Sequence, residues 1–130
     1  MDNEIFEKVK ETLTGALGVD AADVQPESSL VRDLGAESID FIDILFRLEK
    51  NFDIKIPSGE LFPGHILNQE KFAQAGRVTD EGLAELRLKM PYLDVDSFAK
   101  DPVLSKLADF FTVRMVCNYL KGRISSVKAG

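Results

Sequence analysis

The chain has 130 residues, of which 45% are hydrophobic and 29% charged, as in an ordinary globular protein. This length suits one domain, 1–130, with a single core. The net charge of -6 argues against nucleic acid as a partner, because binding a phosphate backbone requires clustered lysine and arginine. The one cysteine, Cys117, excludes an intramolecular disulfide and favours a reducing, cytoplasmic setting. The start of the chain does not resemble a secretory signal, and no run of about 20 apolar residues predicts membrane insertion.

Apolar residues recur at three- and four-residue steps from Ile5 to Leu17, which predicts an amphipathic helix ending at Gly18. The next stretch, 19–36, has no periodicity and is rich in turn-forming residues, so we expect a long loop. Three apolar residues in this loop are expected to hold it to the core: Val24, Leu30 and Leu34.

A second helix is predicted from Glu37 to about Asn51, with two adjoining apolar stripes. The inner stripe is expected to face the other helices and to pack in the core. Two stripes on one helix imply a use beyond core packing. The inner stripe consists of Phe41, Leu45, Leu48 and Phe52, and the outer stripe of Ile39, Ile42 and Phe46.

Proline and glycine interrupt the pattern after this helix. Further along we expect a short helix over 79–90, another opened by Asp101-Pro102, and a last helix capped by Thr112. No strand-like alternation is sustained, so the predicted fold class is all-α with four main helices. The residues expected to face the core from the later helices are Leu83, Leu86, Met90, Leu104, Leu107, Phe110, Val113, Val116 and Leu120.

Ser38 lies where the loop is expected to give way to the second helix. A serine nucleophile needs an adjacent base, and nothing in the sequence brings the one histidine, His65, to Ser38. We therefore expect no catalytic role for this serine. The first turn of a helix stabilises an anion, so a phosphate ester on Ser38 would be well placed there. The alternative is that Ser38 is merely the N-cap of the helix.

The sequence Asp33-Leu34-Gly35-Ala36-Glu37-Ser38-Ile39-Asp40, followed by an acidic amphipathic helix and closed by Asn51-Phe52-Asp53-Ile54-Lys55-Ile56-Pro57, resembles the acyl carrier protein family. That family has D-x-G-x-D-S-L at the start of its second helix and F-D-x-x-I-P after it. Here Glu37 and Ile39 stand where Asp and Leu are usual. The resemblance covers residues 3–57 and resumes at about residue 111.

The resemblance implies an acyl-carrier-like four-helix bundle, with a long loop between helices 1 and 2 and an inserted, partly helical segment at approximately 58–99. It also implies that Ser38 receives 4′-phosphopantetheine from coenzyme A through a Mg²⁺-dependent phosphopantetheinyl transferase. The chain would then be a monomeric carrier, not an enzyme, with no metal site. Its other partners would be acyl-processing enzymes of fatty acid, lipid or polyketide synthesis, such as ketosynthases, dehydratases, acyltransferases or acyl-ligases.

Acidic residues around the second helix would suit docking, because complementary charge raises encounter rates without requiring tight binding. The alternative is a solvated helix face with favourable charge near its N-terminus. The expected docking residues are the acids Asp33, Glu37, Asp40 and Asp43 and the apolar residues Ile39, Ile42 and Phe46.

The inserted segment is too rich in apolar residues to be a solvated linker, so we expect it to pack. It would either serve a dedicated pathway, by enlarging the acyl cavity or restricting which enzymes dock, or only add bulk to a small core. A peptidyl or aryl carrier is an alternative, although such carriers have a Leu-Gly-Gly-x-Ser-Leu site and a less acidic second helix. A carrier-like helical interaction protein, never modified at Ser38, is the other alternative.

Overall fold

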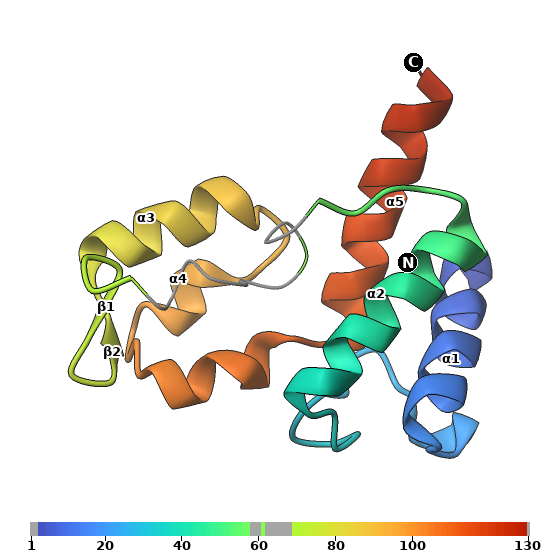
Figure 1. Ribbon diagram of the computed structural model, residues 1–130, viewed down its shortest axis with the longest axis horizontal. Coiled ribbons are helices and arrows are strands. Elements are labelled where there is room, and N and C mark those ends of the chain that lie inside the picture. The colour runs from blue at the N-terminus through green and yellow to red at the C-terminus, as the bar shows by residue number, and fades with distance from the viewer. Residues whose placement is uncertain (1–2, 58–60, 62–68, 130) are drawn as a thin grey trace.

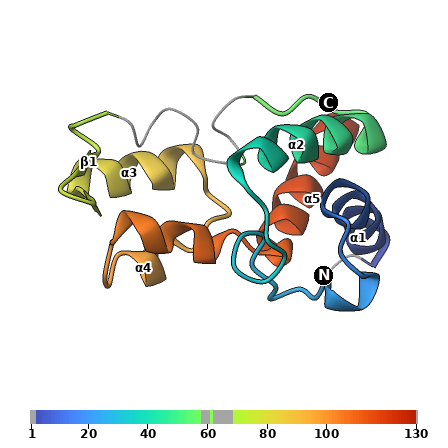
Figure 2. The same cartoon turned by 60° about the horizontal axis from the view of Figure 1, so that its bottom comes forward.

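The structure is a computed structural model that describes residues 3–57, 61 and 69–129. Helices α1 (Asn3–Leu17), α2 (Ser38–Phe52) and α5 (Val113–Ala129) lie together on one side of the molecule, with α1 packed against the other two (Figure 1). The remaining helices and a small hairpin make up the other side, and a second view shows the same division (Figure 2). We call these the carrier part (residues 3–57 and 111–129) and the inserted part (residues 69–110), which extends beyond the predicted insertion at 58–99 to the end of the last 3₁₀ helix.

Helix α1 follows the predicted periodicity and ends where glycine was expected to end it. Its core-facing side chains Ile5, Val9 and Leu13 are buried. Gly18 follows with a φ of 68°, a left-handed conformation that favours glycine, and its N–H donates to the carbonyl of Thr14. The helix and its end are therefore both confirmed.

The long loop between α1 and α2 is ordered by the three apolar residues that the sequence indicates. Val24, Leu30 and Leu34 are all buried. The loop also contains a short 3₁₀ helix, η1 (Ala21–Asp23). These buried side chains hold the loop against the core. The end of the loop at Gly35, and therefore the start of α2, has a fixed position.

Helix α2 has a core face that differs in one residue from the predicted inner stripe. Leu48 is buried as expected, but Ile44, which was assigned to neither stripe, is fully buried, with an exposed fraction of 0%. Phe41 and Leu45 are half-buried and pack against the same core. Positions 41, 44, 45 and 48 share one face of a helix with 3.6 residues per turn, so Ile44 is the centre of that face.

The inserted part begins, within the described residues, with a hairpin that the sequence did not predict. Strands β1 (Ala73–Gln74) and β2 (Arg77–Val78) pair antiparallel, so the all-α prediction is wrong here. Ala75 and Gly76 join the strands, and both have positive φ, as a tight two-residue hairpin turn requires. Strands of two residues are too short to show alternation.

Helix α3 (Asp80–Lys89) matches the predicted short helix, whereas the next prediction needs correction. Thr79 caps α3 by accepting a hydrogen bond from the N–H of Gly82 at 3.0 Å. The short helix α4 (Val95–Phe98) follows, and then the 3₁₀ helix η3 (Leu104–Phe110). Asp101-Pro102 does not open η3, because the Pro102 carbonyl accepts the N–H of Val78 in the hairpin at 2.8 Å.

The two parts share one continuous cluster of buried apolar side chains, running from Ile5 in α1 to Leu120 in α5. Tyr92, between α3 and α4, meets Tyr119 of α5 edge to face, with ring centroids 5.8 Å apart.

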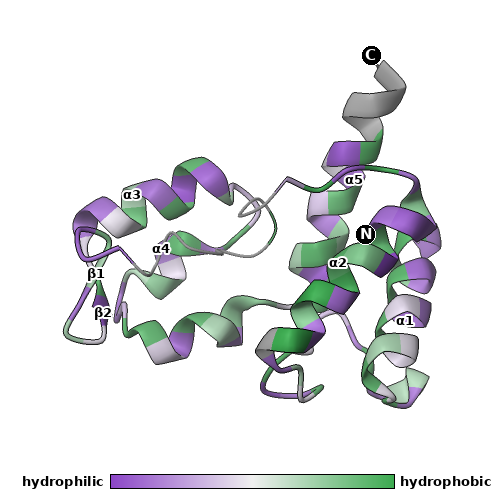
Figure 3. Cartoon of the chain, in the orientation of Figure 1, coloured by the Kyte–Doolittle hydropathy of each residue, from purple (hydrophilic) through white to green (hydrophobic). Residues whose placement is uncertain are grey.

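Thr112 caps α5 as predicted, accepting from the N–H of Met115 at 3.2 Å. Coloured by hydropathy, α3 is largely hydrophilic, whereas α2 carries several hydrophobic residues (Figure 3). No helix in the described part of the chain is long and apolar enough to cross a membrane.

Candidate functional site

Ser38 is the first residue of α2, and the preceding residue, Glu37, occupies the N-cap position. The carbonyl of Glu37 accepts the first helical hydrogen bond, from the N–H of Asp40 at 2.9 Å. The Asp40 carboxylate in turn accepts from the N–H of Glu37 at 2.8 Å. The alternative that Ser38 itself caps the helix is therefore wrong. Ser38 stands inside the first turn, where backbone N–H groups and the helix dipole favour an anion.

The residues just before Ser38 are held by hydrogen bonds within the loop. The carbonyl of Ser29 accepts from the N–H groups of Asp33 and Leu34, at 3.0 and 3.1 Å. The Asp33 carboxylate closes the same turn by accepting from the N–H of Ser29 at 2.7 Å. Gly35 then adopts a φ of 73°, which reverses the chain direction before the helix. Sequence analysis identified the loop but not these bonds.

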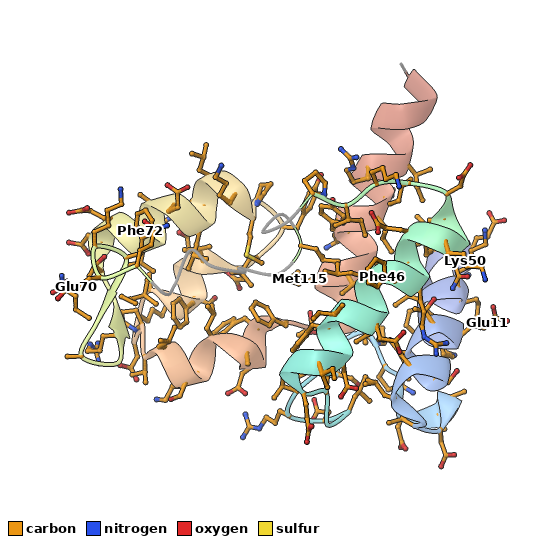
Figure 4. The ribbon with its side chains drawn as sticks, in the orientation of Figure 1. Glu11, Phe46, Lys50, Glu70, Phe72 and Met115 are labelled. Atoms are coloured by element: carbon orange, nitrogen blue, oxygen red, sulfur yellow. The ribbon has the colours of Figure 1, made fainter. Side chains whose placement is uncertain are left out.

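The predicted outer stripe of α2 lies on the surface. Ile39 is 72% exposed, Ile42 58% and Phe46 66%. The spacing of these three residues puts them on one face of the helix, and Phe46 is labelled there in Figure 4. Large apolar side chains that are exposed together mark surfaces that contact other molecules.

Three of the four predicted docking acids lie in α2 or at its N-cap and Asp33 lies in the loop before it, and at least three of the four also have local partners. Asp33 and Asp40 accept backbone N–H groups as described above. Both carboxylate oxygens of Asp43 lie 3.0 Å from Nε of Arg47, one turn later in the helix. Glu37 is exposed at the N-cap. The same acids are therefore available for docking, as predicted, and also stabilise the helix and the loop before it, which is the alternative role.

The stripe continues into a hollow of about 620 Å³ at the C-terminal end of α2, which sequence analysis missed. Phe46 forms one wall, and Arg123 of α5 another. Arg123 donates a hydrogen bond to the carbonyl of Lys55 at 2.7 Å, which joins α5 to the exit of α2. The residues lining the hollow are Phe46, Glu49, Lys50, Asp53, Ile54, Lys55 and Arg123.

Cys117 and His65 are the other residues with side chains that could react or bind a metal ion. Cys117 is buried in α5, as expected for a small apolar core residue. The prediction for His65 lies outside the described residues. Among the residues that the structure describes, no group of three or more histidine, cysteine, aspartate or glutamate side chains is placed to hold a metal ion.

Comparison with known proteins decides the family. Residues 7–65 match the family model of the phosphopantetheine attachment site. The acyl carrier protein of Clostridium acetobutylicum is 45% identical over 56 residues, which make up 43% of this chain and 73% of that protein. The chain belongs to the acyl carrier protein family. No solved structure matches it.

Acyl carrier proteins work through 4′-phosphopantetheine, so this is the cofactor of the chain, and the protein is a carrier without catalytic activity of its own. Membership implies a phosphopantetheinyl transferase and acyl-processing enzymes as general partners. The match covers α1 from residue 7 onward, the long loop and α2. It ends at residue 65, before strand β1 begins.

Proposed function

We propose that this protein carries acyl groups as thioesters on 4′-phosphopantetheine attached to Ser38, and presents them to enzymes of fatty acid, lipid or polyketide synthesis. The observation that supports this most is the position of Ser38: it lies in the matched region, at the start of α2, between the exposed residues Glu37 and Ile39. A modifying enzyme can therefore approach the chain on both sides of the serine.

The other described serines of the matched region are poor alternatives. Ser28 and Ser29 are buried, and each hydroxyl is engaged with the backbone. The Ser28 hydroxyl donates to the carbonyl of Asp23 at 3.0 Å and accepts from the N–H of Gln25 at 3.0 Å. Modifying either serine would require the loop to leave the core.

The first turn of α2 fits a phosphate ester. The N-terminal N–H groups of a 15-residue helix and its dipole stabilise negative charge, and Ser38 is at the first position of that helix. When bound, the cofactor supplies a terminal thiol that holds the acyl group. The work of the chain is to hold the attachment point on a fixed helix end and to present a recognisable surface beside it.

That surface is the face of α2 that contains Ile39, Ile42 and Phe46 with the acids around them. The exposed apolar side chains would bury against a partner, and each large apolar residue buried contributes about 1.5–3 kcal/mol. The acids would attract a basic partner and raise the association rate. Brief, selective contacts of this kind suit a carrier that visits several enzymes.

The inserted part belongs, in this proposal, to the same domain as the carrier part, so that 1–130 is one folding unit. The continuous core and the contact of Tyr92 with Tyr119 support this view. A separate domain would have a core of its own. The inserted part would then adapt the carrier to a dedicated pathway, and deleting it should change which enzymes accept the carrier.

Intact mass spectrometry tests the attachment. Incubation with coenzyme A, Mg²⁺ and a transferase of broad specificity should join the Ser38 oxygen to the phosphorus of phosphopantetheine, with loss of the hydroxyl proton and release of adenosine 3′,5′-bisphosphate. The wild-type mass should rise by one phosphopantetheine, and Ser38→Ala should show no increase. Ser97→Ala is the matched control, because Asp96-Ser97-Phe98 imitates the attachment triplet, and it should be modified like the wild type. An unchanged wild-type mass would reject the proposal.

A further inference from the structure

Phe111, the residue that follows η3, contacts the chain on the N-terminal side of Ser38 through the backbone. The carbonyl of Phe111 accepts from the N–H of Leu30 at 2.9 Å. The carbonyl of Leu30 accepts from the N–H of Ala36 at 2.8 Å, and Ala36 lies two residues before Ser38. Two consecutive hydrogen bonds therefore connect the residue that follows the inserted part to the residues that enter α2.

The side chain of Phe111 contacts the C-terminal side of Ser38. Its ring meets the ring of Phe41 edge to face, with centroids 6.3 Å apart and an interplanar angle of 82°. Phe41 is in the first turn of α2, three residues after Ser38. Phe111 is only 6% exposed, so the ring is fixed by its surroundings. One residue thus holds the chain on both sides of the serine.

Further contacts fix the same segment to the long loop. The hydroxyl of Ser29 donates to the carbonyl of Ala108 at 3.3 Å, and the carbonyl of Ser28 accepts from the N–H of Val113 at 3.0 Å. Arg32 forms an ion pair with Asp109 at 3.5 Å. In both views the end of η3 and the start of α5 lie beside the loop that leads into α2 (Figures 1 and 2). The inserted part and the attachment site are therefore joined directly.

We propose that Phe111 is a positioning residue for the reactions at Ser38, and that the inserted part acts on the attachment site through it. This inference rests on the proposed function of Ser38. Group transfer depends on holding the reacting atoms in a narrow range of positions, and a shift of about 1 Å can cost about 100-fold in rate. A ring and a carbonyl that fix both flanks of Ser38 keep the first turn of α2 in one conformation.

Transferase kinetics with two leucine variants test this role. Phe111→Leu keeps an apolar side chain but removes the ring contact with Phe41. We expect kcat for phosphopantetheine transfer to fall about 10-fold. KM for the carrier should stay within about twofold, because the exposed stripe of α2 is unchanged.

Phe98→Leu is the matched control. Phe98 is equally buried, and its ring meets Phe110 edge to face with centroids 5.7 Å apart, within the inserted part. This variant should retain the wild-type kcat. An unchanged kcat in Phe111→Leu, or an equal fall in both variants, would overturn the inference.

Amide hydrogen exchange of the unmodified protein provides a test that does not depend on modification. Phe111→Leu should increase the exchange rates of Ala36, Asp40 and Phe41 about 10-fold while leaving the amides of α1 unchanged. If the wild type cannot be modified, the proposed function fails, whereas this measurement still decides the positioning role. Wild-type exchange rates at these amides would overturn it. If Phe111→Leu does not fold, Phe41→Leu removes the same contact from the other side and should show the same changes.

Discussion

The hydroxyl of Tyr92 lies directly over Gly122 of α5, so close that a β-carbon on Gly122 would clash with it. Glycine in the middle of a helix is unfavourable by about 1 kcal/mol relative to alanine. Here it leaves room for the side chain that joins the inserted part to the last helix. Through this close contact, α5 packs against both the carrier part and the inserted part.

Gly122→Ala should therefore destabilise the protein despite the higher helix propensity of alanine. The new methyl group forces Tyr92 away from α5 and opens the contact with Tyr119. We expect the free energy of unfolding to fall by up to about 2 kcal/mol, the cost of overpacking less the gain of about 1 kcal/mol in helix propensity, measured by urea denaturation. In the Tyr92→Leu background the same substitution should be neutral or stabilising. A stabilised Gly122→Ala single variant would show that Tyr92 does not occupy this position.

The core face of α2 can be tested with two isoleucines that are two residues apart. Ile44→Ala should lower the free energy of unfolding by about 2–5 kcal/mol, because Ile44 is fully buried. Ile42→Ala, on the exposed stripe, should change it by no more than about 0.5 kcal/mol. Thermal or urea unfolding of both variants measures the difference. Equal losses would contradict the assignment of faces.

Variants of Asp40 can separate its capping hydrogen bond from the effect of its charge on docking. Asp40→Ala removes the acceptor for the N–H of Glu37 and should cost about 1 kcal/mol of stability. Asp40→Asn keeps an oxygen acceptor but removes the charge, so stability should change less. Its association rate with the transferase should nevertheless fall, with a weaker dependence on salt. Wild-type association kinetics for Asp40→Asn would leave Asp40 with a structural role only.

Asp94, the N-cap of α4, should titrate at unusually low pH. Two hydrogen bonds from Ser97, first from its hydroxyl and then from its backbone N–H, lower the pKa of Asp94 below the ordinary 3.8. A lowered pKa stabilises the fold above the unfolded-state pKa, and this contribution is lost as the pH falls through the folded-state value. NMR titration should show the shift, and Ser97→Ala should move the pKa back toward 3.8. An unshifted Asp94 in the wild type would contradict the cap.

Local signals explain why much of the fold could be predicted. Gly18, Thr79 and Thr112 each mark a helix end through the conformation or hydrogen bond of that one residue, so the adjacent sequence is sufficient. The exposed stripe of α2 was predictable for the same reason, because helical spacing alone puts its members on one face.

The errors arise where distant segments decide the local structure. Pro102 pairs with the hairpin and so delays the start of η3. Ile44 is the exception, because its place at the centre of the buried face of α2 follows from helical spacing alone, although it belongs to neither predicted stripe. The contacts of Phe111 with Leu30 and Phe41 connect residues far apart in the chain, and no spacing rule reveals them.

The position of α5 has a consequence for biosynthesis. The buried face of α5 contacts α1 in the carrier part and Tyr92 in the inserted part, yet α5 leaves the ribosome after the other helices of both parts. Until residues 113–120 emerge, neither part has a complete core. The loop before the attachment site also lacks its hydrogen bond to the N–H of Val113. Newly made chains should therefore escape loading with cofactor until α5 has left the ribosome. Ribosome-bound chains stalled before residue 112 should resist transferase labelling, and efficient labelling of them would refute this order of events.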